Sequence, residues 1–381
     1  MAFQNPREIA CTVLQRREGG SDYVENLLAA ELERSPLRPA DRALAQELAY
    51  GAVRWQATLD WLIARKTDGR TQKAGLQTLL RLGLYQLFWL DRVPDHAAVH
   101  ETVELTKRLG FGAQAGFVNA VLRGCLREHD AIRNSLDELK TAQPHLGFSH
   151  PDWLVQRWRA HWGDADLHRL LEWNNTPPKT FARVNTLKTD AARLLNRWRE
   201  QENVTYDFGR WDWIDENTVF ELKQHRPLAE LGSFRDGWFY VQDPSTLLAV
   251  AMLDPKPGET VLDFCAAPGG KTALIGQRLN NEGCVVANDT SPDRVKLVED
   301  NCARLGVTCA RPICNLPPAT PNSQFDRVLI DAPCSNTGVL RRRVDLRWRI
   351  RPEEITRLAA TQLQLLTRAA PLLKPGGTLV Y

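Results

Sequence analysis

The sequence has no long apolar run, few cysteines and almost no excess of one charge. No uninterrupted apolar stretch approaches the roughly 18 residues of a membrane span, which excludes an integral membrane protein. Eight cysteines in 381 residues are too few for a disulfide scaffold, and the N-terminal decapeptide MAFQNPREIA lacks the apolar core of a signal peptide. We therefore expect a soluble protein of the reducing cytoplasm. The sequence has 49 basic and 46 acidic residues. Because these numbers nearly balance, any nucleic-acid-binding surface has to be a local cluster of basic residues.

The composition that remains is that of a globular protein, with 43% hydrophobic and 25% charged residues. The 381 residues predict two or three domains, at roughly 100–200 residues each. In residues 1–140 apolar side chains recur at spacings of three and four, which predicts an all-α domain. Residues 145–235 mix helical and strand-like pieces, typical of a small α+β subdomain, and hold seven of the twelve tryptophans. We expect these tryptophans to pack in cores and interfaces, with base stacking as the alternative.

Residues 236–381 alternate between strand and helix signals. Such alternation predicts a parallel, doubly wound α/β sheet that binds ligands at the carboxyl ends of its strands. The expected strands are 260–264, 284–288, 327–330 and 378–381, and the expected helices are 271–279, 292–305 and 352–373. No long heptad run or large apolar surface is evident, so we expect a monomer.

The strongest local motif is DFCAAPGGKT at residues 263–272, where a strand turns into a helix. A phosphate-binding loop is excluded because Cys265 stands where that motif needs glycine, and the dinucleotide pattern GxGxxG is missing. A nucleoside held by a tight turn remains, with an acid after the next strand for the ribose hydroxyls. Asp289 has this position, 20 residues beyond Gly269. Capping of the helix that begins near Pro292 is the alternative role for Asp289.

A second motif, residues 325–334, brings Asp331, Pro333 and Cys334 to the end of an apolar strand. A thiol in that place, beside a predicted nucleoside site, is a candidate catalytic group. Four other cysteines lie in apolar patterns and are expected to pack: Cys11, Cys125, Cys284 and Cys302. No pair of them has metal-site spacing, so we expect no metal.

The segment 341–351 holds six arginines, one acid and a tryptophan. Basic residues interleaved with an aromatic suit a phosphate backbone with a base stacked nearby. Arg341, Arg342 and Arg343 are therefore candidate RNA-binding residues. A solvated helix face is the alternative.

The two motifs at 263–272 and 331–334 together resemble the Nop/Sun family of RNA cytosine-5 methyltransferases. Residues 50–55, 82–87 and 117–123 resemble the NusB-like RNA-binding domain of one branch of this family. The resemblance runs through essentially the whole chain. It implies a class I, Rossmann-like methyltransferase domain, S-adenosyl-L-methionine as cofactor, and transfer of its methyl group to carbon 5 of a cytidine in small-subunit ribosomal RNA.

The resemblance also implies roles for individual residues. Asp289 would bind the ribose of the cofactor, and Asp331 would lie beside the methyl donor and the target base. Arg183 and Asn185 match a family segment near the RNA cleft. The methionine part of the cofactor would be cradled by Cys265, Ala266, Ala267, Pro268, Gly269, Gly270 and Lys271.

In this family a cysteine thiolate adds to carbon 6 of cytosine and so makes carbon 5 nucleophilic. The nucleophile lies just after the strand that corresponds to 378–381, and the counterpart of Cys334 assists release of the product. Because the sequence stops at Tyr381, before that segment, we expect a fragment of a longer protein. A noncatalytic RNA-binding protein with a residual cofactor site is one alternative. Another makes Cys334 the nucleophile, as a Pro-Cys thiol is in DNA cytosine methyltransferases.

The sequence departs from the family between residues 310 and 318, where an acid usually contacts the adenine side of the cofactor. Here the segment reads RPICNL and offers Cys314 and Asn315 in place of a carboxylate. Asn315 can donate or accept a hydrogen bond. We therefore expect weaker cofactor binding, not its loss.

Overall fold

The computed structural model describes residues 5–316 and 324–381, which form two compact units. The first unit contains residues up to Pro178 together with Asn336–Pro352, and the second contains Lys179–Ser335 and Glu353–Tyr381. This division differs from the boundaries expected at 140, 145 and 235. The segment 145–178 and the arginine-rich segment 341–351 both belong to the helical unit.

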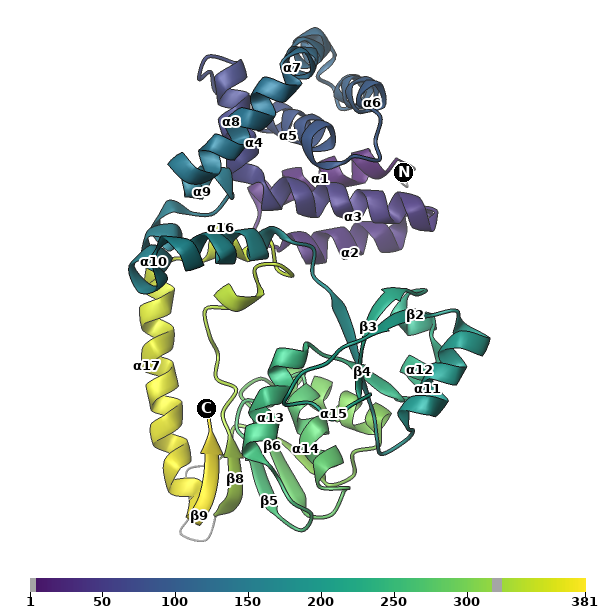
Figure 1. The fold of residues 1–381 in the computed structure, drawn as a ribbon, viewed down its shortest axis with the longest axis vertical. Helices are drawn as coiled ribbons and strands as arrows, with labels where there is room; N and C mark the ends of the chain where they lie inside the picture. The colour runs from purple at the N-terminus through teal and green to yellow at the C-terminus, as the bar shows by residue number, and fades with distance from the viewer. Residues whose placement is uncertain (1–4, 317–323) are drawn as a thin grey trace. The chain divides into compact units, whose positions relative to one another are not determined.

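The first unit is built from helices, as expected for residues 1–140 (Figure 1). Apolar side chains at helical spacing form one core, which includes the fully buried Ile9, Leu48, Leu59 and Leu79. The helices are α1 (Pro6–Gly19), α2 (Val24–Arg34), α3 (Pro39–Arg54), α4 (Gln56–Lys66), α5 (Ala74–Trp89), α6 (Asp95–Arg108), α7 (Ala115–Arg127), α8 (His129–Ala142), α9 (Pro144–Gly147) and α10 (Asp152–Asn175).

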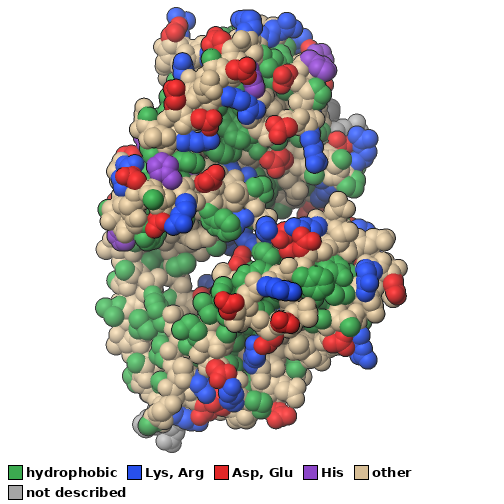
Figure 2. Space-filling model, in the orientation of Figure 1, with side chains coloured by type: hydrophobic (Ala, Val, Ile, Leu, Met, Phe, Trp, Pro, Cys, Tyr) green, Lys and Arg blue, Asp and Glu red, His purple; other side chains and the backbone are tan. Residues whose placement is uncertain are grey.

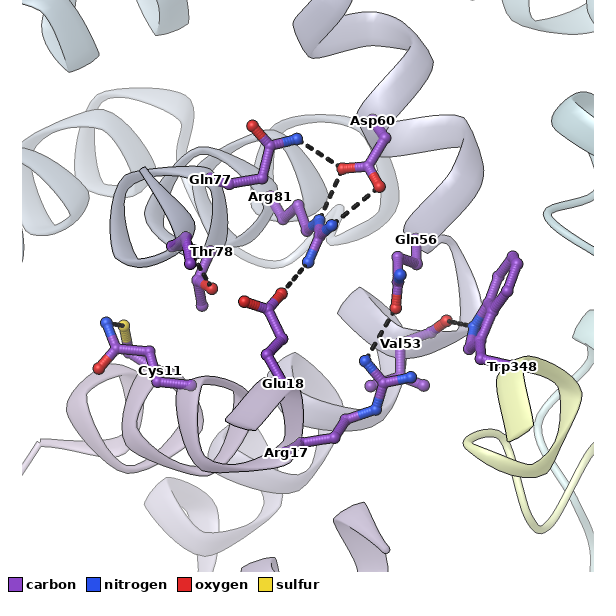
Figure 3. Close-up of polar contacts among 12 residues, drawn as sticks. Cys11, Arg17, Glu18, Val53, Gln56, Asp60, Gln77, Thr78, Arg81 and Trp348 are labelled. Atoms are coloured by element: carbon purple, nitrogen blue, oxygen red, sulfur yellow. Dashed lines mark hydrogen bonds and ion pairs between the residues drawn. The ribbon is translucent and has the colours of Figure 1, made fainter. Parts of the chain in front are cut away.

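Ion pairs and hydrogen bonds of part-buried and exposed side chains join the helices of this unit (Figure 3). Arg81 of α5 binds Asp60 of α4 through two nitrogens, at 2.7 and 2.8 Å, and also pairs with Glu18 of α1. Gln77 donates to the same Asp60 at 2.6 Å. Each cation or amide here has an acceptor, which removes most of the cost of burying it.

The segment 336–352 packs against the helical unit through apolar side chains. Leu340 and Leu346 join a small core with Leu154 and Leu171 of α10. Trp348, from the short helix α16 (Leu346–Arg349), donates its indole N–H to the carbonyl of Val53 at 2.8 Å (Figure 3). These contacts explain why the segment belongs to this unit.

The second unit begins with an antiparallel sheet of order β2-β3-β1-β4, which confirms an α+β subdomain. Its core is centred on the fully buried Trp198. The elements are β1 (Thr180–Val184), α11 (Ala191–Arg197), a short helix at Trp198–Glu202, β2 (Thr205–Phe208), β3 (Val219–Gln224), α12 (Gly232–Arg235) and β4 (Phe239–Val241). The apolar pattern predicts strands at 181–184, 218–222 and 238–241, which correspond to β1, β3 and β4, whereas β2 is not predicted.

A five-stranded sheet of order β7-β6-β5-β8-β9 follows, and all its pairings are parallel, as expected. Four of its strands were predicted, and β7 was not. One face packs on a core that includes Val261, Ile275 and Val298, and the other packs on residues of α17 such as Leu365. The elements are α13 (Leu247–Leu253), β5 (Thr260–Asp263), α14 (Gly270–Arg278), β6 (Cys284–Asp289), α15 (Pro292–Leu305), β7 (Ala310–Cys314), β8 (Phe325–Leu329), α17 (Pro352–Ala369) and β9 (Leu373–Val380).

The surface carries both signs of charge interspersed. Figure 2 shows lysine and arginine side chains scattered among acidic ones on the visible face, in keeping with the near balance of 49 basic and 46 acidic residues. Among the helices of residues 5–316 and 324–381, none is long and apolar enough to cross a membrane.

Candidate functional site

The turn from β5 into α14 is tied to both neighbouring strands by backbone hydrogen bonds. The amide of Phe264 donates to Leu329 of β8, and the amide of Ala266 donates to Asn288 of β6, both at 2.8 Å. Gly269 donates back to Ala266 at 2.7 Å and closes the turn. The turn therefore stands at the carboxyl edge of the parallel sheet, where this architecture binds its ligands.

Two glycines allow the turn to pack closely. Gly269 has φ +99°, and a Cβ there would lie 3.2 Å from Cα of Val298 on α15. A Cβ on Gly270 would lie 2.7 Å from the ring of Tyr240. Any larger residue strains the backbone or displaces a neighbour, so the glycines keep the backbone of the turn in place at the mouth of α14.

Asp263, the last residue of β5, is completely buried beneath the turn. Its Oδ2 accepts a hydrogen bond from the hydroxyl of Thr272 at 2.7 Å, whereas its Oδ1 has no partner. Burial raises the pKa of Asp263 from 3.8 to about 6, and the Thr272 hydrogen bond opposes the shift. The site thus contains an unsatisfied buried acceptor, which a donor on a ligand would complete.

Asp289, at the end of β6, is 4% exposed. Its Oδ2 accepts from the amide of Ala267 at 3.2 Å, and its Oδ1 accepts from the amide of Thr290 at 2.8 Å. A nitrogen of Arg294 lies 3.3 Å from Oδ2. Because both oxygens are engaged at the turn, Asp289 does not cap α15, and the capping alternative is not observed.

An ion pair brings the two sequence motifs together. Nζ of Lys271, on the first turn of α14, donates to Oδ2 of Asp331 at 2.6 Å. The side chain of Asp331 is 53% exposed and follows β8 at the same edge of the sheet. Asp331 therefore carries a carboxylate oxygen that can face a ligand beside the turn.

The two cysteines of these motifs have different surroundings. Burial and the nearby carboxylates of Asp263, Asp289 and Asp331 raise the pKa of Cys265 to about 12. Cys265 therefore stays a neutral thiol near pH 7 and is a poor nucleophile. Cys334 is exposed, after the strand end that carries Asp331.

The remaining cysteines divide by burial. Cys11, Cys125, Cys302 and Cys309 are buried, and burial raises the pKa of each, so packing is confirmed for the first three, as predicted. Cys284 is half-buried, and Cys314 is exposed. Among the described residues no group of three His, Cys, Asp or Glu side chains could hold a metal ion.

Asn315 occupies the place expected for the missing acid, directly after β7. Its backbone φ is +56°, a left-handed conformation that asparagine tolerates. Its amide N–H donates to the carbonyl of Asp289 at 3.0 Å, and its side chain is exposed. An exposed neutral amide therefore stands beside the strand that ends in Asp289. Residues 317 and 318 lie outside the described residues.

Arg183 and Asn185, predicted to bind RNA, are 3% and 0% exposed. Arg183 donates to the side chain of Gln242 at 3.0 Å, to the side chain of Gln277, and to the carbonyl of Gly270 at 3.4 Å. Asn185 donates to two backbone carbonyls at 2.7 Å and accepts from Gln277 at 2.9 Å. Both residues thus fasten β1 to the helix that begins at the turn, and a direct contact with RNA stays a prediction.

The arginine-rich segment divides into an anchored part and an exposed part. Arg347 is 0% exposed and donates to the carbonyls of Arg54, Ser149 and Asn174 at 3.0 to 3.2 Å. Burial lowers the pKa of Arg347 to about 9. Arg341 is half-buried, and Arg342 and Arg343 are exposed. Only the exposed part of the segment is accessible to a partner.

Asp345, in the same segment, is fully buried with its charge compensated. Its carboxylate binds Nε of Arg17 at 2.5 Å and Nε of Arg349 at 3.0 Å, and it accepts the amide of Val24 at 3.1 Å. The single acid of the segment therefore anchors it to α1 and α2. Two arginines of this segment, Arg347 and Arg349, therefore bind groups of the protein itself, although the sequence pattern suggested that they bind phosphates.

Four residues of the site were given no role by the sequence analysis: Asp263, Asn288, Gln277 and Arg294. Asn288 donates its side-chain amide to the carbonyl of Phe264 at 2.9 Å and so holds the turn to β6. A buried polar residue just before Asp289, in an otherwise apolar strand, was a signal that could have found it. Gln277 and Arg294 lie on helices, and nothing in their sequence neighbourhood marks them.

Residues 250–381 match the family described as 16S rRNA methyltransferase RsmB/F, residues 4–127 match the NusB family, and residues 150–207 match the ferredoxin-like domain of RsmF/B-like methyltransferases. The probable ribosomal RNA small subunit methyltransferase B of Bacillus subtilis is 38% identical, over 98% of this chain and 83% of that protein. The ribosomal RNA small subunit methyltransferase B of Vibrio vulnificus is 37% identical, over 91% of this chain and 79% of that protein. A crystal structure of a methyltransferase homolog protein from Pyrococcus horikoshii is 31% identical, with a TM-score of 0.53, over 65% of this chain and 75% of that chain.

Proposed function

The chain belongs to the 16S rRNA methyltransferase RsmB/F family, and we propose that it transfers a methyl group from S-adenosylmethionine to carbon 5 of a cytidine in small-subunit ribosomal RNA. The observation that carries the proposal is the group of three carboxylates, Asp263, Asp289 and Asp331, around one glycine-containing turn at the edge of a parallel sheet. We expect the chain to act as a monomer in the cytoplasm.

The residues at the turn fit S-adenosylmethionine, which carries a positive sulfonium and a positive ammonium group. Carboxylates near a buried turn favour such a cation electrostatically. The unpartnered Oδ1 of Asp263 is an acceptor for a donor on the methionine part. Asp289 would bind the ribose hydroxyls, and the backbone of 265–271 would line the methionine part.

When bound, S-adenosylmethionine supplies an electrophilic methyl group. The chain's own residues orient the partners: Lys271 holds the carboxylate of Asp331 in place at 2.6 Å, beside the exposed Cys334 of the same segment. Arg183 and Asn185 hold α14, and therefore the turn at its beginning, through Gln277. This preorganisation fixes the reacting groups before the RNA arrives.

The proposed chemistry proceeds through a covalent adduct of cysteine with the base. The thiolate of the cysteine that the family resemblance places after residues 378–381 would add to carbon 6 of the cytosine and make carbon 5 nucleophilic. Carbon 5 would then take up the methyl group as the bond between that group and the sulfur of the cofactor breaks, which leaves S-adenosylhomocysteine. A base then removes the carbon 5 proton, and the bond between sulfur and carbon 6 breaks, which returns the thiolate. Cys334 serves this cycle at the step of product release, as the family resemblance implies. The target base must be unpaired or extruded to reach the site.

Analysis of nucleosides tests the proposal. The protein, in a form that also carries the cysteine that the family resemblance places after residues 378–381, is incubated with unmethylated 16S ribosomal RNA and S-adenosylmethionine. The RNA is then digested and examined by mass spectrometry. We expect 5-methylcytidine as the new nucleoside. Binding of RNA and cofactor without any methylated nucleoside would overturn the proposal and favour a noncatalytic RNA-binding protein. A different methylated nucleoside would retain the transferase but reject carbon 5 of cytidine as its target.

A further inference from the structure

One exposed tryptophan of the helical unit is stacked against an arginine of the segment 336–352. Trp173, in the last turn of α10, is 56% exposed. The guanidinium carbon of Arg341 lies 3.8 Å from the centroid of its ring. Arg341 is held there by the chain that follows α10, because its Nη2 donates to the carbonyl of Pro177 at 2.8 Å. The pair is therefore an ordered aromatic–cation stack on the surface.

The exposure of Trp173 is unusual within its own neighbourhood. Of the seven tryptophans between residues 153 and 213, Trp158 and Trp198 are buried at 6% and 0% exposure, and Trp153, Trp211 and Trp213 are half-buried. Packing, the expected role, therefore accounts for most of them. Among the described residues, Trp173 stacks on Arg341 and belongs to no hydrophobic core. An exposed aromatic ring paired with an arginine is the kind of surface on which nucleic-acid bases stack.

Exposed positive side chains next to Arg341 can bind a polyanion. Arg342 and Arg343 follow Arg341 directly and are exposed. The buried Arg347 and Asp345 hold the same segment firmly on the helical unit. The exposed arginines are thus presented from an anchored backbone, which lowers the entropy cost of a contact with phosphates.

We propose that Trp173 and Arg341 form a stacking site for an unpaired RNA base, with Arg342 and Arg343 binding the adjacent phosphates. The proposal rests on RNA as the substrate of the proposed function and adds a recognition site outside the methyltransferase domain. A tryptophan face and an arginine plane both stack on any base. The site therefore recognises unpaired bases and does not distinguish their sequence. An RNA strand uses the ring and the arginines together, because its bases stack and its phosphates pair with the guanidinium groups.

The experiment measures binding of the full chain to two labelled oligomers by fluorescence anisotropy. One is a 12-residue oligouridylate, and the other is the same ribose-phosphate chain without bases. The phosphates are equal in both, so the difference in affinity reports the stacking of bases. We expect Trp173→Ala to weaken oligouridylate binding about 10-fold, within the range of measured base–aromatic stacks, and to leave binding of the base-free chain unchanged.

Trp162 supplies the matched control. It lies on the same α10, before its kink at Gly163, and is 52% exposed, and no arginine is recorded over its ring. Trp162→Ala is expected to leave the affinity for both oligomers unchanged. Trp173→Phe keeps an aromatic face and is expected to retain most of the affinity, which shows that loss in the alanine variant does not reflect misfolding. Arg341→Lys keeps the charge but not the plane and is expected to weaken only the oligomer that has bases.

The proposal is overturned if Trp173→Ala and Trp162→Ala bind oligouridylate equally well, or if the wild-type chain binds the base-free oligomer as tightly as oligouridylate. In either case the stack would serve only to hold Arg341. These outcomes are separate from methylation: 5-methylcytidine formed normally by Trp173→Ala would leave the proposed function intact, and a chain that stacks bases but forms no 5-methylcytidine would reject only that function.

Discussion

The hydroxyl of Thr272 donates to Oδ2 of Asp263 at 2.7 Å inside a turn that leaves the other oxygen of the same carboxylate without a partner. One hydrogen bond does not compensate complete burial of the charge, so the pKa of Asp263 rises from 3.8 to about 6. The turn therefore stores an unfavourable charge that a cationic or hydrogen-bond-donating ligand would relieve.

A dependence of stability on pH follows from this carboxyl group. The pKa of this group is higher in the folded state than in the unfolded chain. Its contribution to the free energy of unfolding is therefore fully present below pH about 4 and is lost as the pH rises through about 6. The loss amounts to ~3 kcal/mol for the difference between the two pKa values. The side chain of Asp263→Asn does not titrate, so this variant does not lose stability as the carboxyl group ionises. Its free energy of unfolding, relative to that of wild type, is therefore expected to increase between pH 4 and pH 7, as measured by thermal unfolding. A difference that does not vary with pH would contradict a raised pKa.

Gly269 and Gly258 offer a matched test of the turn. Both have a positive φ, +99° and +88°, but a Cβ on Gly258 meets nothing within 4 Å, whereas one on Gly269 lies 3.2 Å from Val298. Gly269→Ala is expected to lose cofactor affinity because the turn must move, and Gly269→Asp is expected to abolish it. Gly258→Ala strains the backbone by about 1 kcal/mol and should leave the affinity unchanged in calorimetric titration. Equal affinities for the two alanine variants would show that the turn does not contact the cofactor.

Substitutions at Asn315 test whether this residue takes the place of the acid that the family has here. Asn315→Asp provides the charged acceptor, and a charge-assisted hydrogen bond is stronger than a neutral one by about 1 kcal/mol, or about 5-fold in affinity. Asn315→Gly tolerates the φ of +56° and removes the side chain. We expect cofactor affinity to rise in the first variant and fall a few-fold in the second. If neither substitution changes the affinity, Asn315 does not face the cofactor.

Arg347 and Arg343 should separate structural from RNA-binding arginines. Arg347→Lys leaves buried carbonyls without donors and is expected to lower the stability of the helical unit by at least about 2 kcal/mol. Arg343→Ala, at an exposed position, should change stability by less than about 0.5 kcal/mol. It is expected to weaken RNA binding and reduce its salt dependence by about one counterion. The reverse pattern in denaturation and anisotropy would refute this assignment.

Cys334 is tested by its adduct with RNA. If Cys334 serves product release, Cys334→Ala should accumulate a protein–RNA complex that survives denaturing electrophoresis when the second cysteine of the family is supplied, whereas the same protein with Cys334 intact turns over. Cys314→Ala, at the other exposed cysteine, provides the control and should accumulate no such adduct. Loss of both adduct and methylation in Cys334→Ala would instead make Cys334 the nucleophile, and normal turnover would exclude it from the reaction.

Most strands and helices around the site were predictable because they carry a local signal, whereas strand β7, which precedes Asn315, was not predicted. The apolar strands 260–263 and 284–289 end in aspartates, and glycines mark the turn, so the sheet edge and the position of Asp289 were predictable. Asp263 was given no role, because its burial beneath the turn depends on packing and not on the local pattern. Strand β2 was missed because its four residues are mostly exposed and show no apolar pattern. A strand of that kind is defined by its pairing with β3 and not by its own side chains.

The segment 336–352 could not be placed from the sequence because its partners are distant in the chain. Asp345 binds Arg17, 328 residues away, and Arg347 binds the carbonyl of Arg54, 293 residues away. Local charge density suggested one surface for all six arginines, whereas burial assigns at least Arg347 to the fold. The same limit applies to Arg183, whose partners Gln242 and Gln277 lie on other elements.

Calorimetric titration of S-adenosylmethionine into the full chain tests the central claim most directly, because every proposed role of the turn depends on this ligand. The account predicts saturable binding to one site per chain, lost in Gly269→Asp and retained in Gly258→Ala. A folded wild-type chain that shows no binding, or a Gly269→Asp variant that binds as tightly as wild type, would contradict it.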